Sequence, residues 1–247
     1  MTQALFHQDA YLTECAARVT AVTEAGLILD QTVFYPLGGG QAGDAGTLML
    51  PDGSELHVAD TRKAKDGQGQ PTGDIVHVPA PGQDDLLARV KADDSVIARI
   101  DWARRHRLMR LHTTTHLLCH LVPMPVDGCS ITPAHARLDF HMTDPLDKEA
   151  LTAALAALVA ANHPVTLGSV TDAELDANPT LVKSMSVSPP RGSGTVRTVR
   201  IGASDLIDLQ PCGGTHVART GEIGAVTVTK IEKKSAHTRR VVLGFAD

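Results

Sequence analysis

The chain has 247 residues, of which 43% are hydrophobic and 21% are charged, and its formal net charge is −5 at pH 7. These proportions are typical of a globular protein and exclude a disordered or fibrous chain. The negative charge argues against indiscriminate binding along a phosphate backbone. The longest apolar-rich stretch, residues 151–161, is too short to span a bilayer, and the N-terminus lacks the features of a signal peptide. We therefore expect a cytoplasmic protein whose four cysteines are reduced.

Short apolar segments alternate with turn residues in the first third of the chain, which predicts a small antiparallel β domain. The predicted strands cover residues 16–22, 27–29, 46–50, 55–58 and 74–78. A run rich in Pro, Gly and Asp at residues 79–85 indicates a linker or a long loop. We expect an N-terminal domain of residues 1–95 and a second domain of residues 96–247.

The second part of the chain combines helices with strands, which predicts an α+β domain. One helix is predicted over residues 102–122 with Asp101 as its cap, and another over residues 145–162 with Asp144 as its cap. Alternating or β-branched segments predict strands at residues 137–142, 195–201, 225–231 and 239–245.

Four candidate metal ligands occur in two short motifs, His112-Thr-Thr-Thr-His116 in the first predicted helix and Cys212-Gly-Gly-Thr-His216 far downstream. Residues four apart lie on one face of a helix, so both imidazoles can bind one ion. The two glycines of the second motif allow a sharp turn that can bring its thiol and imidazole to one point. Thiolate and imidazole ligands favour zinc over calcium or magnesium. The two motifs together predict one zinc ion per chain.

Each motif taken alone is also compatible with a chain that binds no metal. A histidine pair at helical spacing can be surface or core histidine. Cys119 lies on the same helix face as His116, where it competes with Cys212 as the ligand or is only a buried apolar side chain. A zincin-type peptidase is excluded because the place of its general base, Glu, is occupied by Thr113. A zinc finger fits badly, because the ligands are too far apart in sequence.

Further motifs accompany the ligands: Phe34-Tyr-Pro-Leu-Gly38-Gly39-Gly40-Gln41, Arg137-Leu-Asp-Phe140, Thr220-Gly-Glu-Ile-Gly224 and Arg239-Arg240. In this order they resemble the motifs of the editing domain of alanyl-tRNA synthetase and of its free-standing relatives, the AlaX family in its medium-length class. The resemblance covers nearly the whole chain. It implies a small antiparallel β-barrel-like N-terminal domain, similar to the translation-factor type, that carries the Gly-rich motif. An α+β editing domain of the threonyl/alanyl-tRNA synthetase type is expected to follow it.

The resemblance also implies an activity. Members of the family remove serine, and in some cases glycine, from alanine tRNA, so we expect a zinc-dependent deacylase acting on the acceptor end of misacylated alanine tRNA. Upstream of the Gly-rich segment there is no room for an aminoacylation core, so the chain is expected to deacylate tRNA and not to charge it. Zinc can activate a bound water or position the substrate. Four protein ligands favour positioning, with a separate water as the nucleophile.

Two segments are candidates for substrate contact beside the metal. Gln41 can hydrogen-bond the substrate or the attacking water. Gly38, Gly39 and Gly40 would let the backbone approach the terminal adenosine closely, although such a run is also common in an ordinary tight turn.

Two threonines and three charged residues are further candidates. Thr113 and Thr115 can contact the serine hydroxyl that distinguishes serine from alanine, or they can be exposed helix threonines. Asp139 can orient a ligand imidazole or simply end a strand. In the light of the resemblance, Arg239 and Arg240 are candidates for tRNA contact.

Positive charge gathers in two segments, which could hold a tRNA end or could be ordinary solvated faces. The members are Arg99, Arg104, Arg105, Arg107 and Arg110 in one segment and Lys230, Lys233, Lys234, Arg239 and Arg240 in the other.

Three classes of function therefore stay open: the editing hydrolase, a tRNA-binding module with a structural zinc, and a metallohydrolase of small esters or amides.

Overall fold

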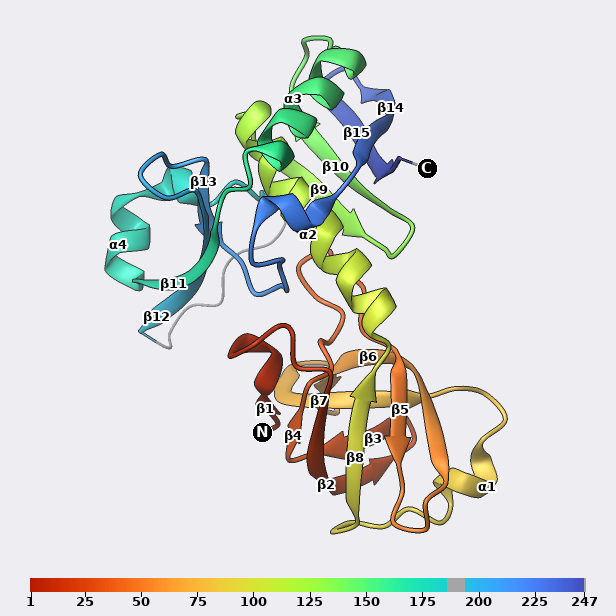
Figure 1. Ribbon diagram of the computed structural model, residues 1–247. Coiled ribbons are helices and arrows are strands. Elements are labelled where there is room, and N and C mark those ends of the chain that lie inside the picture. Colours follow the sequence, from red (N-terminus) through yellow and green to blue (C-terminus); the bar gives the residue numbers. More distant parts are fainter. Residues whose placement is uncertain (186–193, 247) are drawn as a thin grey trace. The chain divides into compact units, whose positions relative to one another are not determined.

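The computed structural model describes residues 1–185 and 194–246, and the chain divides into two compact units (Figure 1). Unit 1 comprises Met1–Gly38 and Ala42–His106. Unit 2 comprises Gly39–Gln41 and Arg107–Asp247. Three residues of the Gly-rich motif thus belong to the same unit as all four candidate ligands.

Unit 1 is built around six strands that pair antiparallel in the order β2-β3-β7-β6-β5-β8 and close into a barrel. Their bounds are β2 Glu14–Thr23, β3 Gly26–Leu29, β5 Gly46–Met49, β6 Glu55–Lys65, β7 Pro71–Pro79 and β8 Ser95–Ile100. Closure leaves none of these six strands with an unpaired edge. The interior is filled by apolar side chains such as Val19, Leu27, Leu48 and Leu56, all fully buried. The antiparallel β character expected of this part is therefore present.

Smaller elements complete unit 1. A short parallel pair joins β1 (Gln3–Ala4) to β4 (Gln31–Thr32), and a 3-10 turn at Leu5–His7 follows β1. The short helix α1 (Asp84–Leu87) begins at the end of residues 79–85, the segment that we expected to be a linker or a long loop.

The division between the units differs from the boundary that we expected near residue 95. Strand β8 pairs with β2 and β5, so it is part of the barrel. The next residues are tied to the same unit by a buried ion pair, in which Arg105 Nε lies 3.0 Å from Asp44 Oδ2 and both side chains are fully buried. The compact division accordingly falls after His106.

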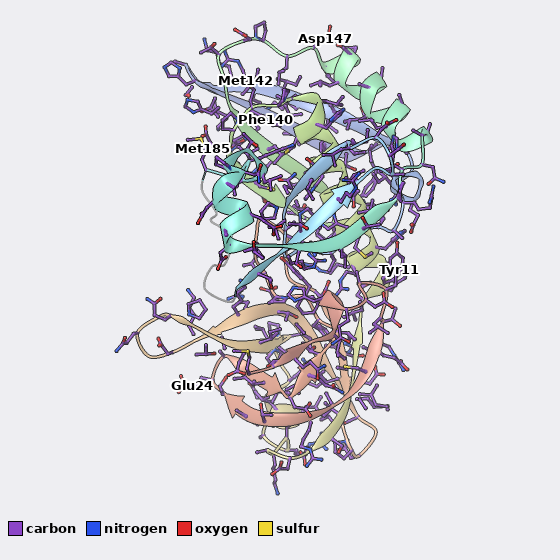
Figure 2. The ribbon with its side chains drawn as sticks, turned by 90° about the vertical axis from the view of Figure 1, so that its left-hand side faces the viewer. Tyr11, Glu24, Phe140, Met142, Asp147 and Met185 are labelled. Atoms are coloured by element: carbon purple, nitrogen blue, oxygen red, sulfur yellow. The ribbon has the colours of Figure 1, made fainter. Side chains whose placement is uncertain are left out.

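A four-stranded antiparallel sheet with the order β14-β15-β10-β9 forms one layer of unit 2. The strands are β9 Val126–Ile131, β10 His135–His141, β14 Val226–Ser235 and β15 Thr238–Phe245. Helix α3 (Lys148–Ala160) packs against β14 and lies across the sheet in Figure 1. Phe140 on β10 is fully buried in this unit (Figure 2).

A second, three-stranded antiparallel sheet of unit 2 has the order β11-β12-β13. Its strands are β11 Val165–Thr171, β12 Thr195–Ile201 and β13 Asp208–Pro211. Helix α4 (Asp172–Ala177) follows β11 directly and starts with a capping box formed by Thr171 and Glu174. The remaining elements are 3-10 turns at Pro179–Leu181 and Thr220–Ile223.

Helix α2 (Trp102–Leu121) carries the histidine pair, and the predicted helix over residues 102–122 is confirmed. Every residue from Leu111 to Cys119 is buried, so this stretch is enclosed on all sides. No helix among the described residues is both long and apolar enough to cross a membrane.

The start predicted for the second helix was wrong. The helix begins at Lys148 rather than at Pro145, because Asp147 and not Asp144 is its cap. The Asp147 carboxylate accepts a hydrogen bond of 2.9 Å from the Ala150 backbone N–H, which satisfies one of the unpaired donors of the first turn. Figure 2 shows Asp147 at this end of α3.

As a whole the chain is a mixed α/β protein, as the sequence predicts.

Candidate metal centre

Four side chains from two separate segments converge in unit 2. Helix α2 supplies His112 and His116, and the turn after β13 supplies Cys212 and His216. One ligand atom from each of them lies within 4.8 Å of all the others. The Cys212 Sγ atom is 3.4 Å from His112 Nε2 and 3.3 Å from His216 Nε2.

The two sulfur–nitrogen separations fit a tetrahedral metal site. Zinc bonds of about 2.0 Å to nitrogen and 2.3 Å to sulfur, arranged at tetrahedral angles, place neighbouring ligand atoms roughly 3.3–3.8 Å apart. The sulfur–nitrogen distances lie in that range. Three imidazoles and one thiolate are also the ligand types that zinc favours.

Each imidazole is oriented by a hydrogen bond at its other nitrogen. His112 Nδ1 donates to the Gln41 side-chain oxygen at 2.7 Å. His116 Nδ1 donates to Asp208 Oδ2 at 2.8 Å, and His216 Nδ1 lies 3.2 Å from the Thr113 hydroxyl. A neutral imidazole with its proton on Nδ1 has the Nε2 lone pair available as a metal ligand. In His116, whose pKa is raised, binding of an ion would also displace a proton from Nε2.

Asp208 was not among the residues singled out from the sequence. Its fully buried carboxylate bonds His116, and it also accepts hydrogen bonds from Lys183 Nζ at 2.6 Å and Gln210 Nε2 at 2.8 Å. Burial alone would raise the pKa of Asp208, but the bonds to His116 and Lys183 outweigh it and lower the pKa to about 2. Burial likewise opposes the charge of His116, and hydrogen bonding to Asp208 still raises the pKa of His116 to about 9.

The thiol of Cys212 is held in a setting that favours its ionised form. Burial opposes ionisation, but the neighbouring imidazoles of His112 and His216 bring the pKa of Cys212 well below the usual thiol value. The Gly214 N–H also donates to its sulfur at 3.4 Å. Arg197 on β12 fixes the turn from outside, since its guanidinium donates to the carbonyl oxygens of Cys212 and Gly214.

Cys119, the competing thiol, does not take part in the cluster found among the described residues. It is buried on α2, and burial raises its pKa to about 12. It is therefore a neutral core side chain, and Cys212 is the thiol that meets the three imidazoles.

Comparisons with known proteins show which family the chain belongs to. Residues 196–242 match the protein family described as the threonyl and alanyl tRNA synthetase second additional domain. Residues 3–104 match the family of class II (A) tRNA synthetases. The alanyl-tRNA editing protein AlaX-M of Methanosarcina acetivorans is 33% identical over the full length of both chains. The protein of the same name from Methanosarcina barkeri is 34% identical, also over the full length of both. The chain belongs to the AlaX-M family.

The relation extends to larger proteins. The alanine--tRNA ligase of Sulfurisphaera tokodaii is 33% identical over 94% of this chain, and that match covers 25% of the ligase. The AlaX-M chain thus corresponds to one section of such a ligase.

In this AlaX-M family member the hydrogen-bonding groups of Gln41 and Thr113 are largely committed to the ligands. The Gln41 oxygen accepts from His112 and from the Thr215 N–H, and its amide donates to the Thr215 hydroxyl, which leaves one N–H. The Thr113 hydroxyl donates to the Met109 carbonyl and accepts from His216 and from the Val217 N–H, so its capacity is used. These contacts differ from the substrate contacts that we expected of both residues.

Thr115 is also buried, with 3% of its surface exposed, and its hydroxyl donates to the His112 carbonyl at 2.7 Å. The alternative that the helix threonines are exposed is therefore wrong. Thr115 still has lone pairs that can accept a further hydrogen bond.

The Gly-rich segment forms a turn with left-handed residues, because Gly39 and Gly40 have φ angles of 58° and 87°. Gly40 packs directly on Cys129, where a Cβ atom would lie 2.9 Å from the sulfur, and its carbonyl accepts from the Ile131 N–H. In unit 1, the Gly38 carbonyl accepts from the Tyr35 hydroxyl.

The two arginines expected to contact tRNA are engaged within unit 2. Arg239 is 8% exposed and donates to the backbone carbonyls of Ser235 and Thr143. Arg240 forms a bidentate pair with Asp139, with bonds of 2.6 and 2.7 Å. Asp139 therefore partners arginine, and the carboxylate that orients a ligand imidazole, one of the two roles considered for Asp139, is that of Asp208.

Proposed function

We propose that this protein hydrolyses the ester of misacylated alanine tRNA, removing serine, with glycine as a second candidate residue. The observation that supports the proposal most is the convergence of three imidazoles on the Cys212 thiolate, with every imidazole oriented by its own partner. Membership of a family whose members carry the name alanyl-tRNA editing protein supports the substrate class.

We further propose that His112, His116, Cys212 and His216 hold one zinc ion. When bound, zinc supplies a Lewis-acid charge that can hold a carbonyl or amino group of the substrate. Four protein ligands make up a complete tetrahedral set with no open position for a bound water, which favours a separate water as the nucleophile. The substrate group would be held only if one ligand left or the coordination shell expanded. The remaining N–H of Gln41 and the acceptor lone pairs of Thr115 are the groups available to orient the aminoacyl ester.

The proposal extends to the parts of the chain. The barrel unit is assigned to the translation-factor type and unit 2 to the threonyl/alanyl-tRNA editing type, with the acceptor end of tRNA as the partner and the cytoplasm as the place of action. Gly38, Gly39 and Gly40 are assigned to the approach of the terminal adenosine.

The deciding experiment compares deacylation of alanine tRNA charged with serine, glycine or alanine, with and without a zinc chelator. Release of serine, retention of alanine and loss of turnover on chelation are the expected results. Tight tRNA binding without turnover would instead indicate a binding module. Cleavage of a small aminoacyl ester with no effect of tRNA would indicate a general metallohydrolase.

A further inference from the structure

The five arginines between residues 99 and 110 have different partners in the structure. Three are engaged within unit 1: Arg99 with Glu14 at 3.0 Å, Arg104 with the Gly43 carbonyl, and Arg105 with the buried Asp44. Two belong to unit 2, Arg107 and Arg110, and neither forms an ion pair with any carboxylate of the described residues.

Arg107 and Arg110 share one aromatic support. The guanidinium carbon of Arg107 lies 4.3 Å from the centroid of the Phe245 ring, and that of Arg110 lies 4.2 Å from it. Each Nε donates to a backbone carbonyl, Arg107 to Pro133 at 2.7 Å and Arg110 to Ile223 at 2.6 Å. Both groups are therefore held in place, with their terminal nitrogens left as donors. We call Arg107, Arg110 and Phe245 the arginine clamp.

The clamp brings two positive charges together, and no carboxylate of the described residues forms an ion pair with either of them. Arg107 is exposed and Arg110 is half-buried. Two cations on one ring repel each other, and an anion bound between them relieves that repulsion.

The two arginines of the clamp lie on the same helix as two of the candidate ligands. Both arginines are on α2, within two turns of His112 and on a different face of the helix, because residues advance by about 100° each. The separation is on the order of 10 Å, the diameter of a helix. Because the clamp and His112 lie on nearly opposite faces of the helix, an RNA strand with its 3′ ester at the centre would bring a nearby phosphate to the clamp by passing around the helix.

We propose that the arginine clamp binds a backbone phosphate of the tRNA strand leading to the metal centre. A planar guanidinium group can donate two parallel hydrogen bonds to the oxygens of a phosphate. Because both guanidinium groups pack on the Phe245 ring, they are ordered before the RNA binds. The clamp takes the tRNA contact that the sequence had suggested for Arg239 and Arg240, which are engaged internally. This inference rests on the proposed function.

The test measures binding of uncharged alanine tRNA at several salt concentrations for the wild type, Arg107→Gln/Arg110→Gln and Arg107→Lys/Arg110→Lys. The glutamine pair should weaken binding about tenfold or more near 0.1 M salt and reduce the slope of log K against log salt by about one, as expected for the loss of one phosphate contact. The lysine pair, which keeps both charges, should retain most of the slope. Arg62→Gln is the matched control, because Arg62 is already neutralised by Asp60 at 2.8 Å.

Steady-state kinetics distinguish the loss of a phosphate contact from damage to the fold. In the glutamine pair, KM for seryl-tRNA should rise while kcat and the cleavage of seryl-adenosine ester stay near the wild type. If that pair unfolds, the single exposed change Arg107→Gln should still lower the slope.

An unchanged salt slope in both glutamine variants would overturn the clamp while leaving the editing activity intact. Clamp-dependent binding to anionic vesicles, with tRNA binding unaffected, would also overturn it and indicate a membrane surface as the partner. Failure of the wild type to deacylate any aminoacyl-tRNA would overturn the proposed function itself, which is a distinguishable outcome.

Discussion

At the scale of the residue, single hydrogen bonds orient the imidazole ligands of the metal centre. Every imidazole has two nitrogens, and the partner at Nδ1 determines which of them faces Cys212. The three partners are of different kinds, an amide, a carboxylate and a hydroxyl. The carboxylate of Asp208 is the one that adds charge, because it is buried, ionised and paired with Lys183 as well as with His116.

Replacing the thiolate should remove most bound zinc. Cys212→Ser is expected to abolish stoichiometric zinc binding, because a neutral hydroxyl is a much weaker ligand than the thiolate at this position. Cys119→Ser is the control, and it should keep full zinc while losing some stability. The measurement is zinc content after dialysis. Full occupancy in Cys212→Ser, or its loss in Cys119→Ser, would contradict the assignment.

Removing the charge of Asp208 should weaken the site without removing a ligand. Asp208→Asn is expected to lower zinc affinity by about 10–100-fold, because His116 becomes a poorer ligand when its partner is neutral. Asp205→Asn, an exposed change three residues earlier, should leave the affinity unchanged. Competition with a chromophoric chelator measures both. Equal affinities in the two variants would mean that Asp208 has only a structural role.

Two elements meet at the centre, the buried helix α2 and the turn after β13, and their contact depends on a missing side chain. A Cβ atom on Gly214 would lie 2.1 Å from His112 Cε1 and 2.9 Å from the Gln41 oxygen. At Gly213 a Cβ atom would meet nothing within 4 Å. One glycine of the motif is therefore required by packing against the helix, and its neighbour is not.

This pair of glycines gives a matched test. Gly214→Ala should displace His112 and Gln41, destabilise the protein by about 1–3 kcal/mol through overpacking, and strongly reduce zinc binding. Gly213→Ala should change neither property appreciably. Urea unfolding and zinc titration report the two effects. Similar behaviour of the two variants would show that the close approach at Gly214 is not needed.

The whole molecule consists of two units that have separate cores, a closed barrel and a pair of sheets with their helices. All four candidate ligands, together with Gln41 and Asp208, belong to unit 2. Anything that binds only the folded state stabilises the part that contains its site.

Removal of metal should therefore destabilise unit 2 selectively. At a free zinc concentration of about 100 times the dissociation constant, binding contributes about 2.7 kcal/mol to the unit that holds it. Calorimetric scans with and without a chelator should show one transition moving to lower temperature and the other, from the barrel, staying in place. Equal shifts of both transitions, or none, would contradict this expectation.

Local patterns in the sequence determined the helix over residues 102–122, the strand over residues 195–201, and the two motifs that carry the four candidate ligands. They did not determine β8 and β9, the two strands that flank this helix in the chain. Local patterns also allowed the family resemblance, because the motifs occur in a specific order. These features depend on spacings of a few residues, which helix and strand geometry translate directly into shared faces.

Only the tertiary structure decided which side chains serve the ligands and which are engaged elsewhere. Asp208 reaches His116 across 92 positions of sequence and Gln41 reaches His112 across 71, and no local period relates such pairs. Packing between distant segments also decides that Cys212 and not Cys119 meets the imidazoles. It pairs Arg240 with Asp139, whereas Arg107 and Arg110 pack on an aromatic ring without a carboxylate partner among the described residues. Folding brings together groups that a local pattern cannot connect, and their burial then determines which of them keep a charge or a lone pair.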